Sequence, residues 1–318
     1  MGARARGRAA RTGSWLGLSA IWIVSAACGD AAPAPAAAAE SDPPVPASAG
    51  AACELVQRGM PLPEEVRESS GLARSTRDDG LFWTHNDAGN SPHLFAIDDE
   101  GTLRGRVRVT GAELVDWEDI ESGPCDGGGC LYVGDIGDND AERERITVYR
   151  VAEPPGGAAD TEPAVALHAR FPDGPQDAEG LFVDGSGTLH LVTKGRRGEI
   201  ALYRWPADVP GETVTLVRVR QLFPEPRDEL DRVTAATATP DRRWVGVRTY
   251  RTLYLYPAQA LLGGGQVEPA VVDLSALAQP QGESLVLADD GAAWLSSEAE
   301  KRDERPRWSW LRCNLPQR

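Results

Sequence analysis

One short pattern recurs five times along this chain, at intervals of 48 to 61 residues. Each copy opens on a polar residue, often Glu, before a short apolar run, and polar turns separate this run from a second run and an aromatic-rich third run. The copies begin at Ser70, Glu118, Glu179, Thr234 and Glu283. A repeat of about 50 residues made of short strands is typical of a β-propeller, with one four-stranded blade per repeat. The sequence therefore predicts an all-β fold with five blades around a central channel.

The fifth copy predicts only three strands before the chain ends, so its blade lacks an outer strand. Residues 53–57 are a free strand at the other end of the domain, and we expect them to pair with the strand that ends at Cys313. Such closure removes exposed sheet edges. The long interval between Glu118 and Glu179 leaves a six-bladed ring as the alternative, although the Pro- and Gly-rich loop 154–163 explains the extra length.

The cysteines fit the same closure. Cys125 and Cys130 flank a turn of Asp and Gly residues, while Cys53 and Cys313 lie at the two ends of the domain. Four cysteines allow three pairings, and we favour Cys125–Cys130 with Cys53–Cys313. A zinc site is the alternative, but no CxxC motif or nearby His supports it.

The first 27 residues have the features of a secretory signal peptide. They contain four Arg and no acidic residue, and their apolar stretch is too short to span a bilayer. The segment ends Ser-Ala-Ala-Cys at Cys28, which resembles a bacterial lipobox in which this Cys is lipidated, although Ser25 replaces the usual Leu. Ordinary cleavage without lipidation is the alternative.

The rest of the chain divides into a tether and one domain. Residues 28–52 are rich in Ala and Pro and predict an extended tether, and residues 53–318 remain as the β-propeller. We therefore expect a bacterial lipoprotein in the periplasm or on the cell surface, with a secreted protein as the alternative. Its membrane contact would be the lipid anchor alone, and we expect a monomer.

The net charge of −15 becomes −19 once the four Arg of the signal peptide are removed. An acidic surface of this size argues against nucleic-acid binding, which requires a basic stripe. It also argues against electrostatic docking on anionic lipid. It is compatible with solubility and with the attraction of cations.

The first strand of each propeller blade lines the channel, so the residues that open the five copies should form one ring. This ring offers only oxygen ligands, from three Glu, one Ser and one Thr: Ser70, Glu118, Glu179, Thr234 and Glu283. Three carboxylates in a narrow channel do not all ionise at low cost, so either a pKa rises or a cation lies between them. Oxygen ligands favour Ca²⁺ over Zn²⁺ or Cu²⁺. The alternative is that the Glu side chains pair with Lys or Arg.

Antiparallel strand order places the start of each first strand and the end of each second strand at the same mouth of the channel. A small molecule or protein bound there would meet the residues that end the second strands: His85, Asn86, Asp87, Asp135, Asp138, Lys194, Arg248 and Glu298. Asp116 and Asp177, just before two first strands, lie at the same rim. Residues 135–140 match an EF-hand loop only in part and favour a turn capped by Asp side chains.

Four blade starts resemble those of the SdiA-regulated family of exported propellers, over about residues 60–312. They read Glu68-Ser-Ser-Gly-Leu72, Asp116-Trp-Glu-Asp-Ile120, Asp177-Ala-Glu-Gly-Leu181 and Gln281-Gly-Glu-Ser-Leu285. The resemblance implies an exported propeller with a channel metal. Esterase-like phytase domains and calcium-dependent apyrases share parts of the pattern, and the match at Glu118, Glu179 and Glu283 implies phosphoester hydrolysis.

The most direct functional hypothesis is a lipid-anchored propeller that binds a divalent cation, Ca²⁺, in its channel and a ligand or partner at one mouth. Metal-dependent phosphoester hydrolysis is the alternative, but its basic residues are reduced to Lys194 and Arg248, with Arg196 and Arg251 as further candidates. Glycoside hydrolysis by two channel carboxylates is a third hypothesis. No motif in the sequence identifies a substrate.

Overall fold

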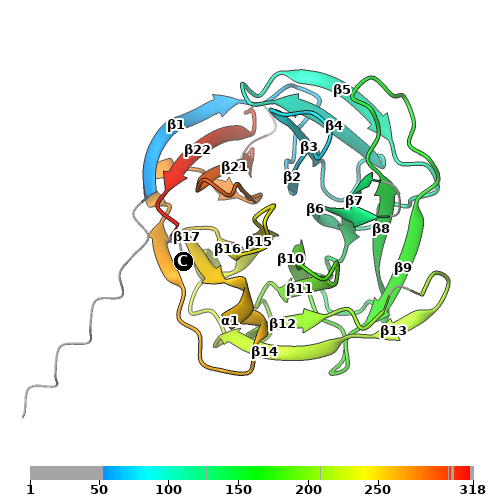
Figure 1. Cartoon of the computed structure of the whole chain (residues 1–318), viewed down its shortest axis with the longest axis vertical. Helices are drawn as coiled ribbons and strands as arrows, with labels where there is room; N and C mark the ends of the chain where they lie inside the picture. Colours follow the sequence, from blue (N-terminus) through cyan, green and yellow to red (C-terminus); the bar gives the residue numbers. More distant parts are fainter. Residues whose placement is uncertain (1–52, 126–127, 208, 300, 302–303, 316–318) are drawn as a thin grey trace, which may run out of the picture. The chain divides into compact units, whose positions relative to one another are not determined.

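The strands stand as five sheets around a central axis, with β2, β6, β10 and β15 innermost (Figure 1). The computed structural model describes residues 53–125, 128–207, 209–299, 301 and 304–315. The predicted signal peptide, Cys28 and the tether lie outside these residues. Among the described residues, no helix has the length and apolar character needed to cross a bilayer.

Each of the first four blades takes four antiparallel strands from its own repeat, ordered from the channel outward. Blade 1 contains β2 (Leu72–Arg74), β3 (Leu81–His85), β4 (His93–Asp98) and β5 (Leu103–Arg108). Blade 2 contains β6 (Trp117–Cys125), β7 (Gly128–Asp135), β8 (Ile146–Ala152) and β9 (Val165–Arg170). Blade 3 contains β10 (Ala178–Val183), β11 (Leu189–Thr193), β12 (Ile200–Arg204) and β14 (Val217–Phe223). Blade 4 contains β15 (Val233–Ala238), β16 (Trp244–Thr249), β17 (Thr252–Pro257) and β18 (Ala270–Asp273).

Blade 5 closes the ring with strands from both ends of the domain. It contains β19 (Gln281–Gly282), β20 (Val286–Leu287), β21 (Ala292–Glu298), β22 (Arg307–Cys313) and, outermost, β1 (Cys53–Pro61). Cys53 lies directly opposite Cys313 in the β1–β22 ladder and is bonded to it, and Cys125 is bonded to Cys130. The five-bladed ring, the closing strand and both disulfides are confirmed, and the six-bladed alternative is not observed.

The outer edge of blade 3 differs from the sequence prediction. The sequence suggests one strand over residues 214–223, but the structure divides it into β13 (Thr213–Thr215) and β14. β13 runs parallel to β9 and extends blade 2 instead. Leu216, at the junction, is buried and donates its backbone N–H to the carbonyl oxygen of Arg170 at 2.9 Å. The segment thus covers the exposed edge of one blade before it enters the next.

The hydrophobic core is divided into five clusters, one between each pair of neighbouring blades. Both faces of a blade are therefore covered, which explains why middle strands such as β3 and β11 are buried along their whole length. Trp83, Trp117, Trp205 and Trp308 are the largest fully buried side chains. Within the described part of the chain, three short helices lie on the loops: α1 (Ala258–Leu262), η1 (Glu229–Asp231) and η2 (Ser275–Leu277).

Candidate functional site

The inner strands of four of the five blades share an irregularity at the residue that opens the sequence repeat. The ladder between β6 and β7 skips Glu118, the ladder of β10 skips Glu179, and the ladder of β15 skips Thr234. Glu283 falls in the gap between β19 and β20. A β-bulge leaves its extra residue outside the ladder and re-aims that side chain. The sequence repeat therefore marks a repeated break in the pairing of the channel strands.

The three glutamates at these breaks, Glu118, Glu179 and Glu283, are all buried. Burial, which disfavours the charged carboxylate, is the largest cause of a raised pKa at each of them and brings the pKa of Glu179 to about 8. Their mutual repulsion adds to this effect, because Glu179 raises the pKa of Glu118 and Glu283 raises that of Glu179. The structure thus brings the three glutamates of the predicted ring within electrostatic reach of one another.

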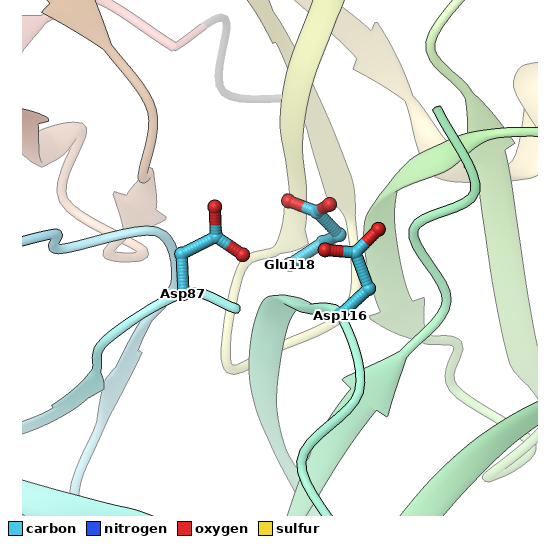
Figure 2. A group of neighbouring side chains, drawn as sticks. All are labelled: Asp87, Asp116 and Glu118. Carbon is cyan, nitrogen blue, oxygen red and sulfur yellow. The ribbon is translucent and has the colours of Figure 1, made fainter. Parts of the chain in front are cut away.

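Three aspartates from the surrounding loops extend the group. Oxygen atoms of Asp87, Asp116 and Glu118 lie within 4.8 Å of one another, and so do oxygen atoms of Glu118, Asp177 and Glu179. Figure 2 shows the first set, with Asp87 reaching toward the two acids of blade 2. We call these five residues the acidic cluster. Glu118 belongs to both sets and lies at the centre of the cluster.

One fully buried oxygen in the acidic cluster accepts no hydrogen bond from the described residues. Asp177 is 7% exposed, and its Oδ1 accepts a hydrogen bond from the backbone N–H of Asp138 at 2.9 Å. Its Oδ2 is buried without a hydrogen bond, and the nearest cation is the Nε atom of Arg196 at 3.5 Å. Burying a carboxylate oxygen without a hydrogen bond costs free energy unless a ligand contacts that oxygen.

A single ammonium group compensates part of this charge. The Nζ atom of Lys194, at the end of β11, donates a hydrogen bond to Oε1 of Glu179. Burial opposes the charged form of Lys194, but the carboxylates of Glu179 and Glu118 raise its pKa overall. The alternative in which a basic residue pairs with the ring glutamates therefore holds for Glu179. One ammonium does not neutralise three buried carboxylates.

The cluster opens onto a less buried acidic rim. Burial raises the pKa of Asp116 to about 6, with a further contribution from Asp87. Glu298, at the end of β21, is half-buried, and burial together with the charges of Glu283 and Asp87 raises its pKa to about 9. The negative potential of the cluster thus continues across the mouth towards blade 5.

Ser70 and Thr234 take up different positions in the predicted oxygen ring. Ser70 is buried in the loop before β2, and its backbone N–H donates to the carbonyl oxygen of Glu68 at 2.9 Å. The hydroxyl of Thr234 donates to the carbonyl oxygen of Gly282 at 2.9 Å. This hydrogen bond links blade 4 to the broken inner strand of blade 5.

Two residues predicted at the ligand mouth lie behind it. His85 is fully buried with its ring edge-on to Trp117 at 5.6 Å, and burial lowers its pKa to about 4. Asn86 accepts hydrogen bonds from the backbone N–H groups of Arg67 and Glu68. Both side chains therefore fix the loop that carries Asp87.

Three further predicted residues also make internal contacts. Asp135 forms an ion pair with Arg143 at 2.9 Å. Asp138 accepts from the backbone N–H groups of Glu142 and Arg143, which forms the Asp-capped turn that the sequence favours. Arg248 is fully buried and donates to the carbonyl oxygens of Ser284 and Ser296.

The sequence did not single out Asp119, which joins three blades. Its carboxylate accepts hydrogen bonds from the backbone N–H groups of Ile120, Leu181 and Ala236, at 2.9, 2.9 and 3.2 Å. These donors belong to β6, β10 and β15. The only signal in the sequence is a second acid directly after Glu118, at the start of the first strand of blade 2.

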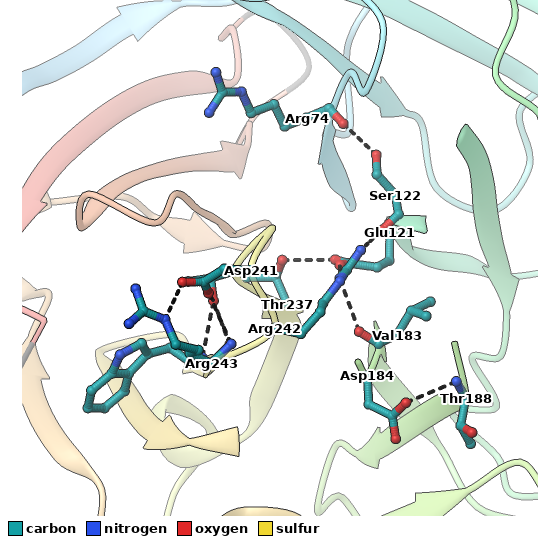
Figure 3. A network of polar contacts seen from close by, with 12 residues as sticks. Arg74, Glu121, Ser122, Val183, Asp184, Thr188, Thr237, Asp241, Arg242 and Arg243 are labelled. Atoms are coloured by element: carbon teal, nitrogen blue, oxygen red, sulfur yellow. Dashed lines mark hydrogen bonds and ion pairs between the residues drawn. The ribbon is translucent and has the colours of Figure 1, made fainter. Parts of the chain in front are cut away.

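The opposite mouth holds a different buried acid, Glu121, from the middle of β6. Its Oε1 accepts from Arg242 at 2.7 Å and its Oε2 accepts from the hydroxyl of Thr237 at 2.8 Å (Figure 3). Arg242 also donates to the carbonyl oxygens of Ser122 and Val183. Burial raises the pKa of Glu121 to about 7, against the opposing effect of Arg242. This network ties three blades together.

Comparison with known proteins yields distant structural neighbours. No family model matches the sequence, and no curated protein matches it at a significant level. A PQQ-bound aldose sugar dehydrogenase from Streptomyces coelicolor is 13% identical, with 84% of this chain and 99% of that chain covered and a TM-score of 0.49. A streptogramin B lyase is 10% identical, with 82% and 98% covered and a TM-score of 0.40. We base no inference about function on these neighbours.

Proposed function

We propose that this protein binds one divalent cation, Ca²⁺, at the acidic cluster in its channel mouth. The observation that carries the proposal is that Oδ2 of Asp177, buried among the carboxylates of Glu118 and Glu179, accepts no hydrogen bond and has only Arg196 at 3.5 Å as an ionic neighbour. With Lys194 paired to Glu179 and Arg196 paired to Asp177, the five carboxylates of the acidic cluster retain a net charge of about −3 when all are ionised. A divalent cation would neutralise most of that charge and coordinate Oδ2 of Asp177.

The ligand set favours a hard cation. All five residues of the acidic cluster offer carboxylate oxygen, and no His or Cys belongs to either of its two sets. Ca²⁺ accepts six to eight oxygen ligands in flexible geometry, whereas zinc sites use nitrogen and sulfur more often. The two overlapping sets would allow Asp87 and Asp116 to complete the coordination from the solvent side.

The cellular setting of this activity supports the same proposal. The two disulfides indicate an extracytoplasmic location, where Ca²⁺ is a common ligand of structural and binding modules. We propose that a lipid on Cys28 and the tether 28–52 hold the propeller near a membrane. The calcium-loaded mouth would then present the rim residue Glu298 to a ligand or partner.

Phosphoester hydrolysis has less support. Lys194 contacts Glu179, and Arg248 is turned into the protein towards backbone carbonyl groups. Arg251 forms ion pairs with Asp228 and Asp231. The basic residues that the sequence offered for phosphate binding are thus already engaged with the protein.

Calorimetric titration of the EDTA-treated protein with CaCl₂, together with thermal melts, tests the calcium proposal. We expect one site, and about 2.7 kcal/mol of added stability at a Ca²⁺ concentration one hundred times the Kd. Glu118→Gln should abolish both effects. Glu153→Gln is the matched control, because Glu153 is buried outside the cluster and holds Ser75 and Trp83. Absence of both heat and a melting shift in the wild type would refute the proposal.

A further inference from the structure

The mouth opposite the acidic cluster opens into two adjoining hollows. The first, of about 680 Å³, is lined by the turns that join the first two strands of all five blades, with Glu121 and Arg242 among its residues. The second, of about 580 Å³, includes the β4–β5 turn of blade 1 and residues of blade 5. Arg74 and Asp289 line both hollows, which makes them two parts of one groove.

Two tryptophans line the outer part of this groove. Trp294 and Trp310 are directly opposite each other in the β21–β22 ladder, and both are half-buried. Their ring centroids are 6.2 Å apart and their planes differ by only 21°. Gln57 of β1 is paired with Trp310 and lines the same hollow. A row of flat or planar side chains thus crosses three neighbouring strands.

The ionic groups of the groove leave an excess of carboxylates. Its three arginines are each paired with an acid of the groove: Arg74 with Asp79, Arg242 with Glu121, and Arg312 with Asp290. Four further acids have no arginine or lysine partner among the described residues, namely Asp99, Glu100, Asp184 and Asp289. The groove therefore offers hydrogen-bond acceptors beside an aromatic surface and would repel an anion.

We propose that this groove binds a neutral oligosaccharide, independently of the calcium site at the other mouth. The apolar C–H faces of a pyranose ring match the nearly parallel rings of Trp294 and Trp310, and aromatic side chains supply most of the contact energy in such sites. The hydroxyls of the sugar would donate to the carboxylates of Asp99, Glu100 and Asp289. Each hollow alone has the volume of a typical small-molecule site, so the groove would hold a chain of several sugar units.

A cationic peptide fits the groove less well, although carboxylates and tryptophans can also recognise amines. The guanidinium carbon of Arg312 already lies 5.5 Å from the ring centre of Trp310. Arg74 and Arg242 line the adjoining hollow. A polycation laid along the groove would therefore meet three guanidinium groups, whereas a neutral chain of hydroxyls meets no such repulsion.

Titration of the full-length protein with chitohexaose, cellohexaose and maltohexaose, followed by tryptophan fluorescence and calorimetry, tests this proposal. We expect at least one of them to bind with a Kd of 1 mM or tighter, and hexagalacturonate not to bind. Trp310→Ala should weaken binding at least tenfold, and Trp310→Phe should retain most of it. Trp244→Ala, which changes a half-buried tryptophan of blade 4 outside the groove, is the matched control and should leave the Kd unchanged.

Variants of exposed residues keep the test valid if Trp310→Ala does not fold. Asp99 and Glu100 lie in an exposed turn, so their double replacement by Ala should weaken sugar binding several-fold without altering the melting temperature. Binding of none of the three neutral sugars would overturn the proposal. Binding of hexalysine instead, or sugar binding unaffected by all groove variants, would also overturn it. EDTA should have no effect on the sugar Kd, which separates this result from that of the calcium proposal.

Discussion

The two mouths of the channel hold glutamates of equal burial in opposite electrostatic settings. Glu121 is 4% exposed, and both of its carboxylate oxygens accept hydrogen bonds from protein side chains. Glu118 is 5% exposed, three residues earlier on the same strand, and has other carboxylates as neighbours. Burial alone therefore does not distinguish them. The difference lies in what compensates each charge: Arg242 pairs directly with Glu121, whereas among the described residues no basic side chain forms an ion pair with Glu118.

This contrast separates a structural acid from a ligand-binding acid. Replacing a buried ion pair by apolar residues is often tolerated, but removing one partner leaves an uncompensated charge. Glu121 and Arg242 compensate each other's charge without any ligand, so this ion pair stabilises the fold in every state of the protein. Among the described residues, the acidic cluster has two cation partners, Lys194 for Glu179 and Arg196 for Asp177, so its stability depends on what occupies the mouth.

The largest loss of stability is expected when the Glu121–Arg242 ion pair is broken. Arg242→Met leaves Glu121 buried without its cation and removes the hydrogen bonds to Ser122 and Val183, so it should cost about 3–5 kcal/mol of unfolding free energy. Urea denaturation measures this loss. The double variant Arg242→Met with Glu121→Gln should lose less unfolding free energy than the sum of the losses of the two single variants. Additive losses would show that the two side chains are not coupled.

Lys194→Met should cause a smaller loss of unfolding free energy, and added Ca²⁺ should restore it. In EDTA the variant leaves Glu179 without its ammonium partner, and we expect a cost of about 1–3 kcal/mol. In Ca²⁺ the metal takes over the role of the ammonium, so the loss should disappear and the affinity for Ca²⁺ should rise. The measurement compares the melting temperatures of Lys194→Met and Arg242→Met, each with and without Ca²⁺. Equal behaviour of the two variants would contradict the proposed difference between the mouths.

The pH dependence of stability follows from the raised pKa values at the acidic mouth. Glu179 and Glu298 have folded-state pKa values of about 8 and about 9, compared with 4.5 for an ordinary Glu. The folded protein therefore retains protons that the unfolded chain releases, and the metal-free protein should lose stability as the pH rises from about 4.5 to 9. Denaturation in EDTA across this range measures the slope. Calcium affinity should rise over the same range, because binding displaces those protons.

The sequence predicted the features that repeat or that lie at the ends of the domain. The spacing from Glu118 to Glu179 and to Glu283 was enough to predict the blades and the residues that approach one another in the channel. The three-stranded fifth repeat and the positions of Cys53 and Cys313 predicted the closing strand. These features depend on residue type and spacing along one chain, which a sequence displays directly.

The parts that the sequence did not predict depend on contacts between blades. Arg248 ends a second strand, as a mouth residue should, but the gap between β19 and β20 leaves the carbonyl group of Ser284 outside the ladder. Arg248 satisfies this group from the neighbouring blade and is thereby turned away from the channel. Asp119 likewise finds its donors on three strands that are far apart in sequence. No local pattern encodes such partners.

The smallest expected effect gives the clearest distinction between the two mouths. In EDTA, Glu118→Gln removes one of several mutually repelling carboxylates, so the metal-free protein should be unchanged or more stable by up to about 1 kcal/mol. Glu153→Gln should instead destabilise, because Glu153 accepts hydrogen bonds from Ser75, Thr76 and Trp83. Urea denaturation of both variants in EDTA, against wild type, is the measurement. If Glu118→Gln lowers the unfolding free energy as much as Glu153→Gln does, then Glu118 has a structural partner. The charges of the acidic mouth would then be compensated within the fold, as they are at the other mouth.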